Sequence, residues 1–153
     1  MTWRVFAFNK LIRDKMYKSI SNKGAKVNLL EITSREELIQ CFKNKLLEEV
    51  HEVTDATNDI ELTEELADCV EVINGFLKAI SVSKDSFEKI RQRKYDARGG
   101  FGMPYMVNDI AVSSVYTDPN YYNFFINYCI SSPLKYPEIT SDNKYNKTKD
   151  DVS

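Results

Sequence analysis

The stretch of sequence that decides the fold runs from Ser34 to Ile80 and reads SREELIQCFKNKLLEEVHEVTDATNDIELTEELADCVEVINGFLKAI. It contains no proline and a single glycine, so little interrupts a helix along it. Ser34 and Glu37 form a capping-box pattern, which predicts that a helix begins there. Asn58-Asp59 predicts a break. We therefore expect one helix before this break and a second helix over residues 60–80.

Apolar side chains recur at helical spacing on both sides of the break. In the first segment they are Leu38, Phe42, Leu46, Val50 and Val53. In the second segment they are Leu62, Leu66, Cys69, Ile73, Phe76, Leu77 and Ile80. Each stripe predicts an amphipathic helix, the first extending to about Ala56, and the two helices are expected to pack along their apolar stripes.

Three further helices are predicted, over Asn9–Asn22, Lys84–Ala97 and Tyr121–Ile130. Lys23-Gly24 is expected to end the first of them, Ser83 to cap the second and Gly99-Gly100 to end it. The alternation in Met1 to Phe8 predicts a short strand or an extended arm.

The expected fold is all-α, an antiparallel helical bundle of about four helices followed by a C-terminal extension. Only five glycines occur in 153 residues, which favours helices over sheets. Residues 1–101 would form the core domain. Residues 102–153 are rich in Tyr, Asn, Asp, Ser and Pro, and would form a partly helical extension with a flexible tail from about residue 138.

Composition argues against several classes of protein. The formal net charge is -2, from 21 basic and 23 acidic residues, so no nucleic-acid partner is expected. No run approaches the roughly 20 apolar residues of a membrane helix, and the N-terminus does not read as a signal peptide. Three widely spaced cysteines without a CxxC pair indicate reduced thiols and a cytoplasmic location, and a single histidine argues against a zinc site.

Four carboxylates are the candidate metal ligands. Glu49 and Glu52 are three residues apart, as are Glu65 and Asp68, so each pair shares one face of its helix. Both pairs border an apolar stripe, near the seam where the two helices would meet. Converging carboxylates repel unless cations neutralise them, and oxygen ligands suit magnesium or manganese. Acidic pairs are also common on solvated helix surfaces, so both interpretations stay open at this point.

Three segments, in order, resemble signatures of the MazG-like, all-α nucleotide pyrophosphohydrolase superfamily, and of its phosphoribosyl-ATP pyrophosphohydrolase-like branch. Glu48-Glu49-x-x-Glu52, followed after twelve residues by Glu65-x-x-Asp68, is similar to the superfamily's metal motif. Residues 9–15, NKLIRDK, resemble the signature NKLVRDK, and residues 94–101, KYDARGGF, resemble KxxxRGGF. Together the matches span residues 9–101.

The resemblance implies magnesium-dependent hydrolysis of nucleoside triphosphates, or of related nucleotides, between the α and β phosphates. Manganese is the expected substitute ion. By position, the metal ligands would be Glu49, Glu52, Glu65 and Asp68. Glu48 would lie beside the metal-bound water or the nucleotide and act as the base. Lys94 and Arg98 match positions that contact phosphates, and family members are commonly oligomers, so a homodimer or homotetramer is expected.

Two points lie outside this carry-over. Lys10, Arg13 and Lys15 are expected to form a phosphate-facing patch, although an ordinary charged helix surface explains them equally well. Many relatives carry Asn seven residues after the last metal ligand, where this chain has Gly75.

The alternative function is a catalytically silent helical module that binds a nucleotide or a protein. The sequence does not identify the preferred base.

Overall fold

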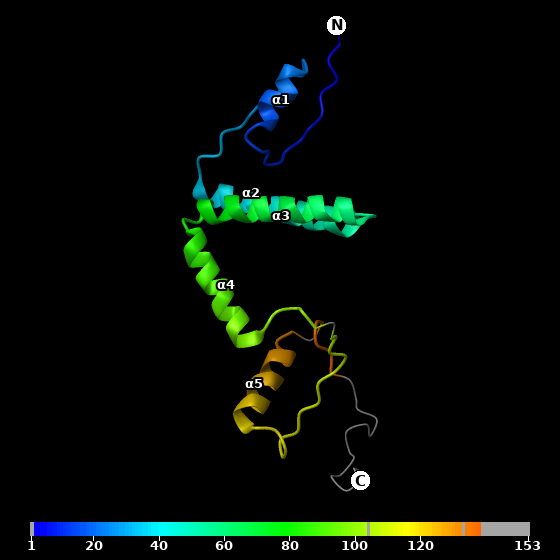
Figure 1. Ribbon diagram of the computed structural model, residues 1–153, viewed down its shortest axis with the longest axis vertical. Coiled ribbons are helices and arrows are strands. Elements are labelled where there is room, and N and C mark those ends of the chain that lie inside the picture. Colours follow the sequence, from blue (N-terminus) through cyan, green and yellow to red (C-terminus); the bar gives the residue numbers. More distant parts are fainter. Residues whose placement is uncertain (1, 104, 133, 139–153) are drawn as a thin grey trace. The chain divides into compact units, whose positions relative to one another are not determined.

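The computed structural model describes residues 2–103, 105–132 and 134–138. Within these ranges the chain forms α-helices and no β-strand, which confirms the predicted all-α class. The helices, shown in Figure 1, are α1 (Met16–Asn22), α2 (Arg35–Asp55), α3 (Asp59–Ala79), α4 (Lys84–Arg98) and α5 (Pro119–Ile130). The first four belong to unit 1, Met1–Gly100, and α5 belongs to unit 2, Phe101–Ser153.

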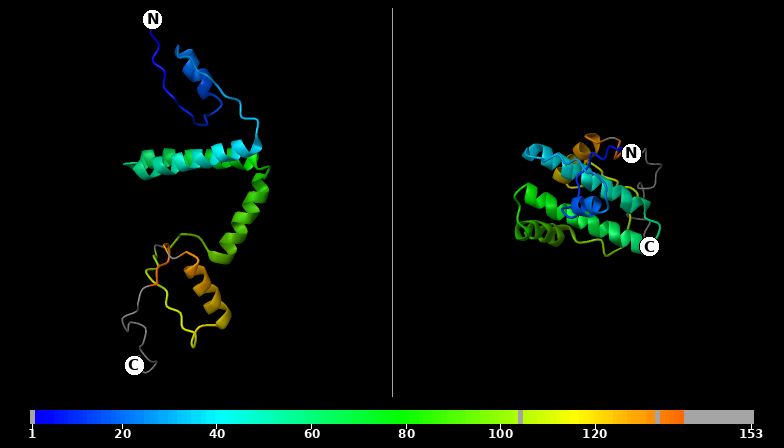
Figure 2. Two further views of the ribbon diagram at one scale, coloured as in Figure 1. Left: turned by 180° about the vertical axis from the view of Figure 1, so that it is seen from behind. Right: turned by 90° about the horizontal axis from the view of Figure 1, so that it is seen from above.

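The α2–α3 pair is the body of unit 1. Residues 56–58 join the two helices, and so short a connection makes them antiparallel neighbours. They lie side by side in each view of Figures 1 and 2. α4 also contacts α3, over fewer residues. The antiparallel part of the predicted bundle is therefore represented chiefly by α2 and α3.

Local capping signals position the starts of the three long helices. The Ser34 hydroxyl accepts a hydrogen bond from the Glu37 N–H, as the capping pattern predicted. The Asn58 side chain accepts from two N–H groups in the first turn of α3. Ser83 caps α4 in the same way. α4 ends at Gly99, whose φ of 75° lies in the left-handed region that glycine adopts at little cost.

The predicted helix over Asn9–Asn22 is only partly correct, because α1 begins at Met16. Residues 2–8 likewise have no regular secondary structure, so the extended arm and not the strand is present. Asn9 has a φ of 40°, which is not helical, and no side chain caps the N-terminus of α1 among the described residues. Short uncapped helices are marginal. Residues preceding α1 instead send side chains to α2 and α3.

The core lies between α2 and α3. Val72 is buried there, while Leu77, the other buried apolar residue in the described part of the chain, lies on the side of α3 that borders α4. The rings of Phe42 and Phe76 stack with centroids 5.7 Å apart. A Cβ at Gly75 would lie 2.7 Å from the Phe42 ring, so glycine permits this close approach.

The predicted apolar stripe of α2 does not stay buried throughout. Val50 is 44% exposed. A spacing of four residues advances 40° more than one turn of a helix at each step. The stripe has therefore rotated by about 120° between Leu38 and Val50.

Unit 2 contains α5, at the position predicted for residues 121–130 but beginning at Pro119. Asp118 caps it by accepting from the N–H groups of Asn120 and Tyr121. Aromatic rings stack along the helix, and the Tyr128 and Tyr136 hydroxyls lie 3.0 Å apart. The predicted flexible tail from residue 138 lies almost wholly outside the described residues. None of the described helices has the length and hydrophobicity needed to cross a membrane.

Candidate metal centre

Three of the four predicted metal ligands converge at the seam between α2 and α3. Glu49 comes from α2, and Glu65 and Asp68 come from successive turns of α3. Each offers one carboxylate oxygen, and these three oxygens lie within 4.8 Å of one another. At an effective dielectric of about 20, two unit charges at this distance repel by roughly 3–4 kcal/mol. The cluster therefore favours a cation at its centre.

Glu52, the fourth predicted ligand, lies at the edge of this cluster. Burial raises the pKa of its carboxyl above the ordinary value, and the negative charges of Glu49 and Glu65 raise it further. With Glu65 it lines a small hollow of about 220 Å³ near the turn that joins the helices. The charge of the cluster therefore affects the pKa of Glu52, although no oxygen of Glu52 belongs to the group of three.

Glu49 is the most buried of the four, with 2% of its surface exposed. Its Oε1 atom pairs with Lys45. Its Oε2 atom is buried and has no hydrogen-bond partner within the described residues. An ionised carboxylate oxygen in this condition is costly, which is a reason to expect a bound cation.

Lys45 is a residue of this centre that the sequence analysis missed. Its Nζ lies 2.6 Å from Glu49 Oε1 and 3.0 Å from Glu48 Oε1. Burial opposes the charge on Lys45, but its hydrogen bonds with these two glutamates outweigh that effect and raise its pKa. The signal was present in the sequence, because Lys45 precedes the two glutamates by three and four residues, the spacing of neighbours on a helix.

The N-terminal segment also reaches the carboxylates. Lys10 Nζ lies 2.7 Å from Glu48 Oε1, and Arg13 pairs with Asp68. The hydrogen bond from Lys10 lowers the pKa of Glu48, while burial acts in the opposite sense. The structure therefore places two of the predicted phosphate-binding cations against the carboxylates. Lys15 is exposed and forms no ion pair in the ranges that the structure describes.

Lys94 and Arg98 are not brought to the carboxylates. Both are exposed in the last turns of α4, and neither forms an ion pair with another described residue. Lys94 and Arg98 belong to the same unit of the chain as the carboxylates. Their predicted role at the phosphates stays a prediction.

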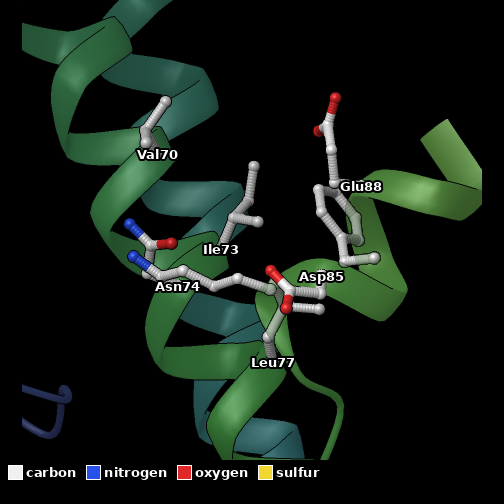
Figure 3. Close-up of a pocket in the computed structure, with 8 residues that line it drawn as sticks. Val70, Ile73, Asn74, Leu77, Asp85 and Glu88 are labelled. Atoms are coloured by element: carbon white, nitrogen blue, oxygen red, sulfur yellow. The ribbon is translucent and has the colours of Figure 1, made fainter. Parts of the chain in front are cut away.

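A larger hollow, of about 460 Å³, lies between α3 and α4, and none of the carboxylates of the cluster lines it. Figure 3 shows Val70, Ile73 and Leu77 of α3 facing this space, with Asn74 beside them. Asp85 and Glu88 of α4 are on its other side. The hollow is mainly apolar, so its chemistry differs from that of the α2–α3 seam.

The carboxylate cluster fits a hard divalent ion. All its candidate donors are oxygens, as magnesium and manganese prefer. The unpartnered oxygen of Glu49 is the local feature that a bound ion would satisfy. A thiol-based site does not arise here, because the three cysteines are free and belong to no ligand cluster among the described residues.

Comparison with known proteins identifies no relative, since no family model, curated protein or solved structure matches the chain. The carboxylate cluster and the sequence resemblance of residues 9–101 are therefore what point to a function.

Proposed function

We propose that this protein hydrolyses nucleoside triphosphates, or related nucleotides, between the α and β phosphates in a magnesium-dependent reaction, with manganese as a substitute ion. The observation that carries the proposal is the convergence of Glu49, Glu65 and Asp68, together with a buried oxygen of Glu49 that has no hydrogen-bond partner among the described residues. The motif resemblance supports the same activity, because the converging residues are those that match the metal motif.

Four carboxylates would hold the ion: Glu49, Glu52, Glu65 and Asp68. When bound, magnesium supplies positive charge to phosphate oxygens and lowers the pKa of water. The remaining negative charge of the phosphates would be met by cations of this chain, namely Lys10, Arg13, Lys15, Lys94 and Arg98. Positioning and charge complementarity are most of what phosphoryl transfer requires from a protein.

The bond changes follow from the site of attack. A water oxygen forms a bond to the α phosphorus, and the bond from this phosphorus to the bridging oxygen breaks. Glu48, whose Oε1 atom is held by Lys10 and Lys45, would accept one proton from the attacking water. The products are a nucleoside monophosphate and pyrophosphate.

The test is product analysis with a nucleotide panel, with and without magnesium, in water enriched in oxygen-18. We expect monophosphate and pyrophosphate, with the label in the monophosphate, and no reaction in excess chelator. Diphosphate and orthophosphate as first products would contradict the proposed site of attack. Nucleotide binding without any hydrolysis would instead favour the silent binding module.

We further propose that the protein acts in the cytoplasm as a homodimer or homotetramer. Few apolar side chains are buried in unit 1, while Leu66 and Val70 of α3 are 50% and 57% exposed. A second copy packed on this surface would remove apolar area from water, which is the main favourable contribution to association. Light scattering coupled to size exclusion measures the mass directly, and a monomer at micromolar concentration would contradict this proposal.

A further inference from the structure

Residues 9–15, here named the strap, lie across the two helices that carry the carboxylates. Lys10 pairs with Glu48 of α2, and Arg13 pairs with Asp68 of α3. Between these two anchors, Leu11 and Ile12 are half-buried. No backbone hydrogen bond ties residues 9–12 to α2 or α3 in the described part of the chain. The polar attachment of the strap to the helices is therefore made by two cationic side chains.

We propose that the strap competes with a divalent cation for Asp68, so that binding of the ion releases Arg13 toward the phosphates of the nucleotide. This inference rests on the proposed function for the identity of the ion and the nucleotide. It adds that one cation, Arg13, serves the carboxylates and the phosphates in turn. Ion binding and nucleotide capture are thereby coupled.

Competition follows because both interactions use the Asp68 carboxylate. Asp68 offers an oxygen to the three-carboxylate cluster, and it is also the partner of Arg13. A divalent ion at the cluster would neutralise the charge that attracts the guanidinium. Arg13 would then be attracted to the next strongest local negative charge, which is a bound phosphate.

The ion pairs differ in how readily they exchange. The side chains of Arg13 and Asp68 are 54% and 42% exposed, and such pairs contribute only about 0–1 kcal/mol. Lys45 and Glu49 are 18% and 3% exposed, so breaking this pair would leave a buried charge without a partner. A bound ion is therefore expected to displace the strap and to leave Lys45 in place.

The first measurement is the affinity of the full chain for Mn²⁺, by electron paramagnetic resonance of the free ion. Because Arg13 competes for Asp68, Arg13→Gln should lower the Kd for Mn²⁺ by about twofold to fivefold, which is what the loss of an exposed ion pair permits. Lys18→Gln on α1 is the control, since it removes a positive charge close in sequence to the strap, and Lys18 forms no ion pair with another described residue. Equal affinity in the wild type, Arg13→Gln and Lys18→Gln would overturn the inference.

The second measurement is the mobility of the strap backbone, from ¹⁵N relaxation order parameters of residues 10–15. Addition of Mg²⁺ to the wild type should lower these order parameters, and Asp68→Asn should lower them without any ion. Unchanged order parameters in both experiments would overturn the inference even if Mn²⁺ binds and the nucleotide is hydrolysed, so the proposed function would stand. If the wild type binds no Mn²⁺, the proposed function and the competition are both wrong, while the order parameters of Asp68→Asn still report whether the contact holds the strap.

Discussion

The two sides of α3 present different environments within a few residues of each other. The side that faces α2 carries Glu65 and Asp68 among charged neighbours, with a buried oxygen of Glu49 that has no partner in the described chain. The other side carries Val70, Ile73 and Leu77 and borders the larger hollow with α4. The buried oxygen without a hydrogen-bond partner therefore lies at the α2–α3 seam and not at the larger hollow.

This difference follows from helix geometry. Residues three apart on a helix lie on one face, whereas Asp68 and Val70 are about 160° apart around the axis. The charged side is held by ion pairs that are sensitive to substitution by neutral groups. The apolar side contributes packing and hydrophobic burial. Substitutions on the two sides should consequently separate catalysis from stability.

The largest expected effect is on the charged side. Glu65→Gln and Asp68→Asn should each lower kcat/KM on the order of a thousandfold or more, because an amide is a poor magnesium ligand and the ion is worth several kcal/mol to the transition state. Helical circular dichroism should be retained. The control is Glu64→Gln, an exposed neighbour on α3. Full activity of either variant would remove the functional distinction between the two sides.

The next effect concerns α4, whose first turns line the apolar hollow and whose last turns carry Lys94 and Arg98. If these cations stabilise the departing pyrophosphate, Lys94→Ala and Arg98→Ala should each lower kcat/KM by about 30- to 1000-fold, equivalent to ~2–4 kcal/mol. Thermal stability and magnesium affinity should hardly change. Arg93→Ala is the control on the same helix.

A loss below about threefold in both α4 variants would identify Lys94 and Arg98 as ordinary surface charges. The carry-over of the C-terminal motif would then be wrong, and the charged side of α3 would act without α4. A large loss would mean that α4 approaches the nucleotide, and the two sides of α3 would be linked through the substrate.

On the apolar side, Leu77→Ala should lower the free energy of unfolding by about 2–5 kcal/mol, because it removes buried methyl groups and leaves a cavity. The activity of the protein that remains folded should be close to that of the wild type. Val70→Ala, at a position that is 57% exposed, should cost less than about 1 kcal/mol. Urea denaturation and activity per folded molecule measure the two quantities. Lost activity in folded Leu77→Ala would show that packing also sets the site.

Sequence predicted the helices where local signals decide the structure. The side chains of Ser34, Asn58 and Ser83 occupy N-cap positions because their oxygens satisfy N–H groups two or three residues away. The break at residue 58 and the end of α4 at Gly99 are local for the same reason. Such signals do not depend on the rest of the fold.

The site was predictable only in part, because it depends on how one helix is rotated against another. The i, i+3 spacing correctly grouped Glu65 with Asp68, but which α2 carboxylate joins them depends on the rotation of α2, which the sequence does not specify. Glu49 is inside and Glu52 is at the edge. The strap was predicted as part of a helix over Asn9–Asn22. Its ion pairs join residues 38 and 55 positions apart in sequence, and periodicity carries no information on such contacts.

The smallest expected effect tests whether the charged side is destabilised by its own carboxylates. Burial and the charges of Glu49 and Glu65 raise the pKa of Glu52 in the folded protein above its ordinary value. A carboxyl with a raised pKa binds its proton more tightly in the folded state than in the unfolded state. The stability contributed by this proton is therefore complete below the ordinary glutamate pKa of about 4.3, and it is lost as pH rises through the folded-state pKa.

Glu52→Gln removes this unfavourable charge, so in chelator at pH 7 the variant should melt about 1–3 °C above the wild type, the scale of one like-charge contact on a helix. The difference should vanish near pH 4, where the wild-type carboxyl is protonated. Glu64→Gln is again the control, and its Tm should not follow this pattern. Saturating magnesium should reverse the order at pH 7, because the wild type gains stability from a bound ion that the variant holds more weakly. A variant that melts below the wild type in chelator at pH 7 would mean that Glu52 stabilises the fold through a favourable contact, and the charged side of α3 would not be frustrated by its own carboxylates.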